Sequence, residues 1–135
     1  MLIIGEIEPG IRIGSLRIGA MKEELLSQIE DKYTVWERED GFSIYTFDNY
    51  KLWFDVDGSL RQIGVTDGFI GSYKSVHIGT TMKEIKNDFG DYENENDEYE
   101  ISGVKGLCFE LGDMDDCDDW DELEAPIEWI FVYKC

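Results

Sequence analysis

The sequence has few of the residues on which most catalytic and cofactor-binding sites depend. Its 135 residues include one histidine, three cysteines and two prolines. Because His77 is the only histidine, every Ser-His-Asp or Cys-His arrangement would have to include it, and we expect an ordinary surface residue there. Gly64, Gly68 and Gly71 have neither the spacing nor the lysine of a phosphate-binding loop. The sequence therefore favours a protein that is not an enzyme and binds no cofactor.

Disulfides, targeting segments and long apolar runs are also missing. Cys108, Cys117 and Cys135 are odd in number and have no CxxC spacing, so we expect reduced thiols and no metal site. The first residues have neither the basic start nor the apolar stretch of a secretory signal. No stretch approaches the roughly 20 apolar residues of a membrane span. These absences predict a cytoplasmic protein.

Positive charge is scarce and unevenly distributed. The chain has 31 acidic and 12 basic residues, which give a formal net charge of −19. Residues 1–67 contain 13 acids and 7 bases, whereas residues 68–135 contain 18 acids and 5 bases. Such a field repels the phosphates of nucleic acids and anionic membranes, and it attracts basic proteins or cations. We therefore expect no direct nucleic-acid or membrane contact, and a basic partner.

The sequence contains an internal repeat. Residues 16–26 resemble residues 76–86, and further matches extend to Phe54 and Phe109. Two copies are too few for a solenoid, so we expect one domain over residues 1–135. It would consist of one unit at about 11–67 and a second at about 74–135. This alignment gives Leu25, Phe54, Ile85 and Phe109 matching core positions.

Hydrophobic periodicity predicts a helix and three strands in each unit. In the first unit the helix covers about 20–32 and the strands cover 42–47, 50–56 and 60–66, with Asp57-Gly58 as a hairpin turn. In the second unit a capping box, Thr81 to Glu84, begins a helix that ends at Gly90. An acidic segment, 91–98, then separates it from strands at 99–102, 107–111 and 127–133. The last strand is nearly all apolar, which is typical of a central strand.

We therefore predict an α+β fold in which two helices pack on one antiparallel sheet, built from tandem αβββ units with pseudo-symmetry. The inserted segment between the last two strands, Gly112 to Pro126, is the main departure of the second unit from the first. Loops on a rigid scaffold often carry function.

This inserted segment is the predicted binding site for a partner. It combines an aromatic anchor with a dense negative charge, a combination that suits docking of a basic protein. The predicted contact residues are Asp113, Asp115, Asp116, Asp118, Asp119, Trp120, Asp121 and Glu122, together with Trp53. The other candidate surface is the sheet face that carries Lys51, Trp53 and Asp55.

Two alternatives concern the same segment. A cation- or ligand-binding module could use residues 113–124, but an EF-hand loop that starts at Asp113 would place Cys117 fifth and Asp118 where the turn needs glycine. A solvated loop kept for solubility is the other. A physiological Ca²⁺ site is therefore less favoured than a protein-binding surface.

The phrase from Pro9 to Glu24, in which a glycine-rich strand leads into a helix start, resembles the opening of small bacterial toxin-immunity proteins. The tandem helix-plus-meander plan is similar to the β-lactamase inhibitor protein fold, a duplicated unit whose concave sheet binds an enzyme. This sequence differs in lacking the disulfides of that secreted inhibitor. The resemblance implies a bacterial immunity or inhibitor protein that blocks the active site of a basic toxin, for example a ribonuclease.

Overall fold

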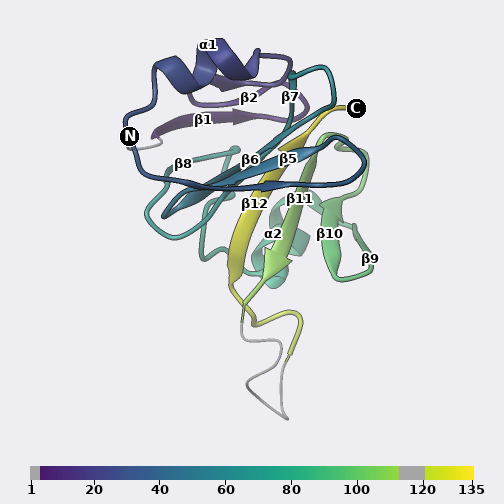
Figure 1. Cartoon of the computed structure of the whole chain (residues 1–135). Helices are drawn as coiled ribbons and strands as arrows, with labels where there is room; N and C mark the ends of the chain where they lie inside the picture. The colour runs from purple at the N-terminus through teal and green to yellow at the C-terminus, as the bar shows by residue number, and fades with distance from the viewer. Residues whose placement is uncertain (1–3, 113–120) are drawn as a thin grey trace.

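A computed structural model of the chain describes residues 4–112 and 121–135 (Figure 1). Over these residues the chain forms twelve strands and two helices. The strands in the first part of the chain are β1 (Ile4–Glu8), β2 (Arg12–Ile13), β3 (Leu16–Arg17), β4 (Thr34–Glu37), β5 (Ser43–Thr46), β6 (Tyr50–Phe54), β7 (Leu60–Val65) and β8 (Ile70–Ser72). The later strands are β9 (Tyr92–Glu95), β10 (Glu98–Ile101), β11 (Leu107–Leu111) and β12 (Ile127–Tyr133), and the helices are α1 (Lys22–Ser27) and α2 (Met82–Phe89).

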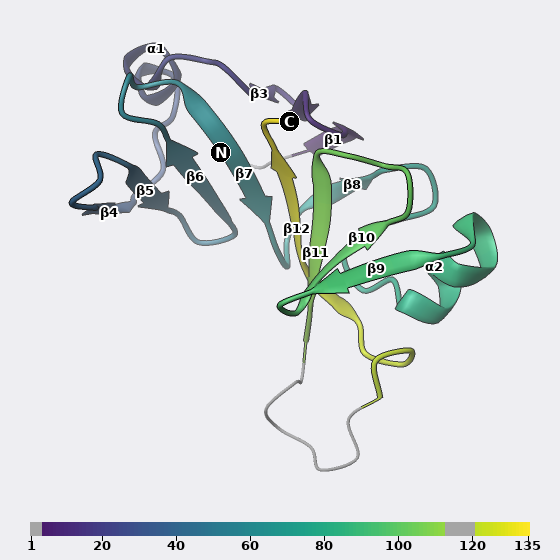
Figure 2. The same cartoon turned by 90° about the vertical axis from the view of Figure 1, so that its right-hand side faces the viewer.

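The described strands form two sheets. The larger has the order β4-β5-β6-β7-β12-β11-β10-β9 and is antiparallel throughout. The smaller has the order β3-β2-β1-β8, and its β1–β8 pair is parallel. The larger sheet twists along its width, with β4 at one end and β9 at the other (Figure 2). Residues from both sheets and both helices share one hydrophobic core.

This architecture corrects the predicted fold class. The protein is mostly β and has two sheets, so it is not a pair of helices packed on one sheet. The expectation failed because residues 4–17 and 70–72 add a second sheet that contributes Ile7, Ile13 and Leu16 to the core. In addition, each half supplies four strands to the larger sheet instead of three.

The two helices differ in how far their ends are specified locally. In α2, the Thr81 side chain accepts from the Glu84 N–H, the Glu84 side chain accepts from the Thr81 N–H, and Gly90 ends the helix with φ 94°. This helix confirms the predicted capping box and C-terminal glycine. In α1, Met21 at the N-cap makes no side-chain hydrogen bond, and the helix has only six residues. The predicted helix over 20–32 was therefore too long.

The acidic segment 91–98 was also misjudged, since it contains strand β9 and its turn. Asn96 and Asp97 have φ of 53° and 66° and connect β9 to β10. Two consecutive positive φ angles in a two-residue hairpin loop indicate a type I′ turn, which asparagine and aspartate tolerate. The turn residues Asn96 and Asp97 could have identified this hairpin, but the segment was expected only to separate the helix from the next strand.

Matching hydrogen bonds relate the two halves. The Gly19 N–H donates to Leu60 O and the Leu60 N–H to Ala20 O, both at 2.8 Å. In the second half the Gly79 N–H donates to Ile127 O at 2.9 Å, and the Ile127 N–H donates to Thr80 O at 2.8 Å. The halves meet where β7 pairs with β12, so a pseudo-twofold axis passes between these strands.

Strand register shows which core residues correspond. Leu52 lies opposite Ile63, and Phe109 lies opposite Ile130. The hydrogen bonds above match Leu60 with Ile127, so Ile63 matches Ile130 and Leu52 matches Phe109. Phe54 therefore corresponds to Leu111, and the sequence alignment that matched Phe54 with Phe109 was two residues out of register. A slip of two keeps a side chain on the same face. Accordingly, the four residues expected in the core, Leu25, Phe54, Ile85 and Phe109, are all at most 8% exposed.

Candidate partner-binding face

The face of the larger sheet that points away from the core carries all three described tryptophans. In β6, Tyr50, Leu52 and Phe54 point into the core, so Lys51 and Trp53 point the other way. We call this second side the outer face. Cross-strand pairing places one row of side chains on it, Trp36, Ile44, Trp53 and Gln62. A neighbouring row consists of Lys51, Gly64, Phe131 and Cys108.

Three aromatic rings pack together near the centre of the outer face. The Trp129 and Phe131 rings are stacked, with centroids 5.8 Å apart and planes 9° apart. The Trp53 ring meets Phe131 edge-on, also at 5.8 Å. Phe131 is buried, whereas Trp53 and Trp129 are half-buried. The cluster is therefore a partly exposed aromatic surface of the kind found in interface cores.

Gly64 leaves room for this cluster. A Cβ atom on Gly64 would lie 2.7 Å from the Phe131 ring and 3.1 Å from the Trp53 ring. Gly64 and Phe131 are cross-strand partners at the pseudo-twofold axis. The Phe131 ring thus occupies the space that a side chain at Gly64 would need.

Basic side chains lie against rings on the outer face and at its rim. The Lys51 Nζ atom is 5.2 Å from the Trp129 ring centroid. At the rim, the guanidinium carbons of Arg61 and Arg38 are 5.0 and 5.9 Å from the Phe42 centroid. Such contacts are typically worth about 0.5–1 kcal/mol at exposed sites. They hold three of the twelve basic residues at defined positions on a strongly acidic protein.

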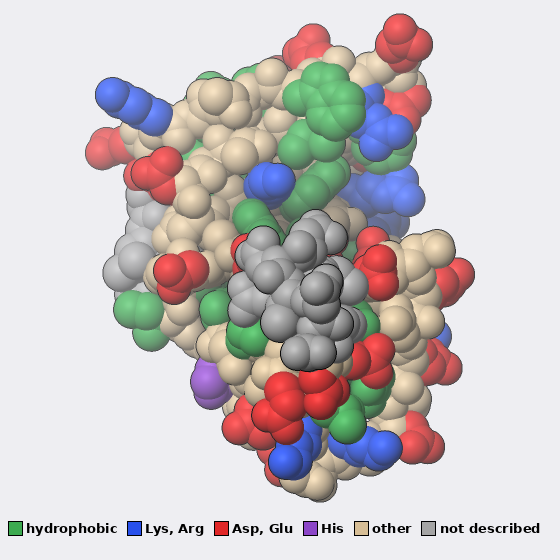
Figure 3. Space-filling model, turned by 90° about the horizontal axis from the view of Figure 1, so that it is seen from below, with side chains coloured by type: hydrophobic (Ala, Val, Ile, Leu, Met, Phe, Trp, Pro, Cys, Tyr) green, Lys and Arg blue, Asp and Glu red, His purple; other side chains and the backbone are tan. Residues whose placement is uncertain are grey.

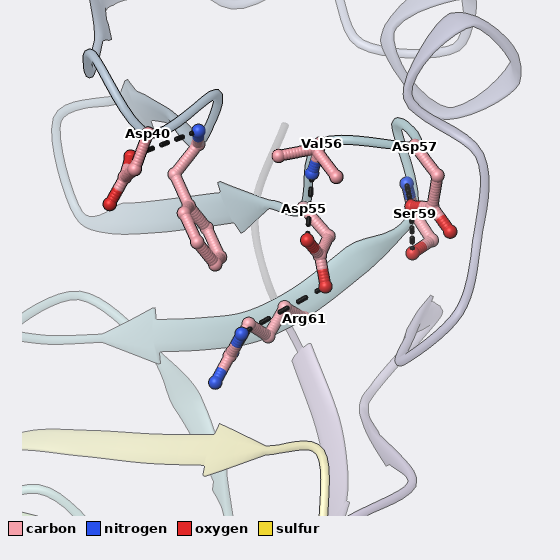
Figure 4. Close-up of polar contacts among 7 residues, drawn as sticks. Asp40, Asp55, Val56, Asp57, Ser59 and Arg61 are labelled. Atoms are coloured by element: carbon pink, nitrogen blue, oxygen red, sulfur yellow. Dashed lines mark hydrogen bonds and ion pairs between the residues drawn. The ribbon is translucent and has the colours of Figure 1, made fainter.

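Each of the two arginines at this rim also lies near one carboxylate. An Arg61 nitrogen is 3.9 Å from Asp55, and an Arg38 nitrogen is 3.1 Å from Asp40. Figure 4 shows Arg61 on β7 reaching toward Asp55 at the end of β6, beside the turn in which Asp57 accepts from Ser59. A hollow of about 270 Å³ lies between these residues, lined by Arg38, Asp40, Phe42, Trp53, Arg61 and Gln62.

The other half of the outer face is acidic. Glu93 on β9 lies directly opposite Glu100 on β10, and Glu95 lies opposite Glu98. Glu110 on β11 points to the same side, because it pairs with Trp129. Like charges directly opposite one another destabilise a sheet. Burial raises the pKa of Glu110, and the negative charge of Glu98 raises it further.

The outer face is therefore divided into an aromatic part with basic residues, over β4–β7 and β12, and an acidic part over β9–β11. Seen from below, hydrophobic side chains lie beside basic ones in the upper right of the view, and acidic side chains follow its right-hand side and the part below its centre, where basic side chains also lie (Figure 3). A division of this kind gives a partner both an apolar contact and a charge that orients it.

Most of the predicted site falls outside the described residues, and the rest is dispersed. Asp113, Asp115, Asp116, Asp118, Asp119 and Trp120 lie outside those residues. Trp53 is on the outer face. Asp121 forms a turn, in which its carboxylate accepts from the Leu123 N–H and its carbonyl accepts from the Glu124 and Ala125 N–H groups.

Glu122 has a structural role in addition to its predicted one. It accepts hydrogen bonds from the hydroxyl of Tyr92 and, at 2.9 Å, from that of Tyr99. Burial raises the pKa of Tyr92 to about 12, and the hydrogen bond to Glu122 contributes. Tyr99 is 1% exposed, and its pKa is raised by the same two causes. Glu122 therefore fixes the end of the inserted segment to the β9–β10 hairpin.

Sequence reasoning missed Trp36, Trp129 and the acidic stripe of β9–β11 as parts of one surface. Lys51 and Trp53 did point to this face, through strand alternation. The other residues come from strands whose pairing the sequence does not specify. The apolar segment 127–133 correctly predicted a central strand, between β7 and β11, but hid the fact that Trp129 is half-exposed.

His77, the only histidine in the sequence, lies at the surface. The His77 ring is exposed, and its Nδ1 atom lies 2.8 Å from the carbonyl oxygen of Ile78, its neighbour in the chain. Among the described residues, no three His, Cys, Asp or Glu side chains are placed to hold a metal ion. Over the same residues, neither helix is long and apolar enough to cross a bilayer.

Comparison with known proteins shows the fold alone. No protein-family model matches the sequence, and no curated protein matches it. Among solved structures, the chain is similar to the crystal structure of the uncharacterized protein yfeY from Escherichia coli, with a TM-score of 0.60. The identity is 14%, over 97% of this chain and 99% of that one. The likeness thus extends over the whole fold and assigns no activity, and the resemblance to immunity proteins stays a prediction.

Proposed function

We propose that this protein is a non-enzymatic binding protein that docks a basic protein partner on the outer face of its eight-stranded sheet. The observation that carries this proposal is the division of that face. Trp36, Trp53 and Trp129 lie on one part, and five glutamates lie on the other. Tryptophan is enriched at binding hot spots, and an acidic field accelerates the approach of a basic protein.

Folding stability does not account for this composition. The pairs Glu93–Glu100 and Glu95–Glu98 are each unfavourable by roughly 0.2–1 kcal/mol, by analogy with measured cross-strand pairs. The Trp36 side chain is 63% exposed and so contributes little to the core. The glutamate pairs weaken the isolated protein and Trp36 adds little to its stability, whereas both become favourable when a basic surface with an apolar centre covers them.

The partner class follows from charge and from the resemblance to immunity proteins. A chain of net charge −19 attracts a basic protein. We propose a basic toxin, for example a ribonuclease, because a row of carboxylates can occupy an active site that binds phosphates. The acidic segment 113–122 remains a second predicted contact for the same partner.

Site-specific photo-crosslinking in the native host identifies the partner. A photoreactive phenylalanine analogue replaces Trp53 on the outer face, and a matched control carries it at Ile70, which is 58% exposed on β8 of the smaller sheet. The proteins captured at each position are identified by mass spectrometry. The proposal requires a basic protein that is captured from Trp53 and not from Ile70.

Binding kinetics with the purified pair then test the two parts of the face separately. Trp53→Ala should raise the dissociation rate about thirtyfold, which corresponds to a lost anchor of about 2 kcal/mol. Glu95→Gln combined with Glu98→Gln should instead slow association and reduce its dependence on salt between about 50 and 300 mM. Capture of an acidic protein, or unchanged rates in both variants, would refute the proposal.

A further inference from the structure

Strand β4 forms an open edge of the larger sheet and carries an exposed apolar side chain on each of its two sides. Val35 is 44% exposed on the core side, and Trp36 is 63% exposed on the outer face. Tyr33, just before the strand, is 45% exposed. Figure 2 shows β4 at the lateral end of the sheet. An apolar edge of this kind is a template for pairing with another strand unless it is protected.

The equivalent edge in the second half is protected. Strand β9 occupies the position related to β4 by the pseudo-twofold axis. It carries Glu93, Asn94 and Glu95, all exposed. Charged side chains on an edge strand discourage pairing with another chain. β4 carries one charged residue, Glu37, whereas β9 carries two, so the β4 edge is the less protected of the two.

The hydrogen-bonding pattern of β4 shows which backbone groups face outward. The Arg38 N–H donates to Phe42 O at 2.8 Å, so Arg38 and Phe42 form a hydrogen-bonded pair with the neighbouring strand. Along an antiparallel ladder, hydrogen-bonded residue pairs alternate with pairs that are not hydrogen-bonded to each other. Trp36 therefore points its N–H and C=O groups toward β5, whereas Val35 and Glu37 point theirs away from the sheet.

We propose that β4 pairs antiparallel with β4 of a second copy of this chain, about a twofold axis at Trp36. Val35 then lies opposite Glu37 of the second copy, and Glu37 lies opposite Val35 of the second copy. Each of these two pairs exchanges two hydrogen bonds, which satisfies all four outward backbone groups of each strand. The two Trp36 side chains face each other at a non-hydrogen-bonded position, where aromatic pairs are favourable. This inference does not rest on the proposed function.

The charge distribution is compatible with this arrangement. The first half carries 13 acids and 7 bases, and the second carries 18 acids and 5 bases. Pairing through β4 joins the less acidic halves and leaves the two β9 edges at the far ends of the assembly. Repulsion between the copies remains, and one strand pair is a small contact, so we expect a weak dimer that is strengthened by salt. The basic partner of the outer face has the opposite salt dependence.

Sedimentation equilibrium of the purified full-length protein tests the dimer. The average mass should rise from monomer toward dimer with concentration, and the dissociation constant should fall when salt is raised from about 50 to 500 mM. The alternation described above points the Val35 N–H away from β5, so Val35→Pro should leave the ladder with β5 intact and the monomer folded by circular dichroism. We expect the dimer dissociation constant to rise at least tenfold in this variant.

Two matched variants serve as controls for the loss of the Val35 N–H group. Val35→Thr has nearly the same shape and keeps the N–H group, so it should keep most of the dimer. Asn94→Pro places proline at an outward-facing position of the opposite edge, and it should leave dimerisation unchanged. A monomer at every concentration, an equal loss with Asn94→Pro, or weaker association at high salt would each overturn the proposal. So would protection of the Val35 amide from hydrogen exchange only when the crosslinked partner is added, since that would assign this edge to the partner.

Discussion

Gly64 gives the sharpest test of how the outer face is built. Its φ is not in the left-handed region, so the backbone itself accepts a side chain. On backbone grounds alone, Gly64→Ala should stabilise the protein by about 0.4–1 kcal/mol, because alanine reduces the entropy of the unfolded chain. The packing predicts the opposite sign. A Cβ atom would lie 2.7 Å from the Phe131 ring, closer than carbon atoms approach in folded proteins.

We therefore expect Gly64→Ala to destabilise the protein by about 1–3 kcal/mol, the usual cost of overpacking. The entropy argument and the packing argument predict opposite signs for the change in the free energy of unfolding, so even a small measured change separates them. Urea unfolding followed by circular dichroism gives the free energy of unfolding. Tryptophan fluorescence of the folded variant should also change, because Trp53 and Trp129 both contact the displaced Phe131 ring.

A double-mutant cycle assigns the cost to this contact. Phe131→Leu removes the ring, and Gly64→Ala in that background should cost at least 1 kcal/mol less than it does alone. Gly103→Ala is a poor control, because Gly103 has a φ of 85° and alanine there is strained whatever the space. A stabilised Gly64→Ala protein, or strictly additive effects in the cycle, would refute the packing argument.

Three further predictions concern the core, α2 and the tyrosines around Glu122. Phe54→Ala and Phe109→Ala should each lower the free energy of unfolding by about 3–5 kcal/mol in urea titrations, because both side chains are fully buried. A loss below about 1 kcal/mol in either would contradict the core assignment. Thr81→Ala should cost about 1 kcal/mol by removing the capping box, whereas Met21→Ala should cost less than about 0.5 kcal/mol because Met21 makes no capping hydrogen bond. Tyr92 has a pKa of about 12 when folded and 10 as its ordinary value, so the stability it contributes is complete below pH 10 and is lost as the pH rises to about 12. Urea unfolding at a series of alkaline pH values measures this loss, which should shrink in Tyr92→Phe.

Several elements are specified locally and were predictable from the sequence. The capping box at Thr81 and Glu84 with Gly90 fixes both ends of α2, because the hydrogen bonds and the positive φ belong to neighbouring residues. The bounds of β11 and β12 matched the predicted segments 107–111 and 127–133. Alternation in β6 placed Lys51 and Trp53 together on one face. In each case residues within a few positions of one another carry the whole signal.

Other features depend on residues far apart in the chain. Helix α1 ends at Ser27 although the apolar periodicity continues to Ile29, which is buried outside the helix. The second sheet depends on the pairing of β1 with β8, which lies more than sixty positions later in the chain. No local pattern identifies that partner.

The candidate face shows the same division. The sequence alone determined the acidic balance, the likeness between the two halves and the alternation of Trp53 with the core residues of β6. Only the tertiary structure placed Trp36, Trp53 and Trp129 beside a stripe of glutamates, because that arrangement depends on the pairing of β7 with β12. Strand pairing is decided by the packing of the whole core, since any two antiparallel strands offer the same backbone hydrogen bonds. Composition is therefore the basis for proposing a basic partner, and the fold is the basis for the surface proposed to bind it.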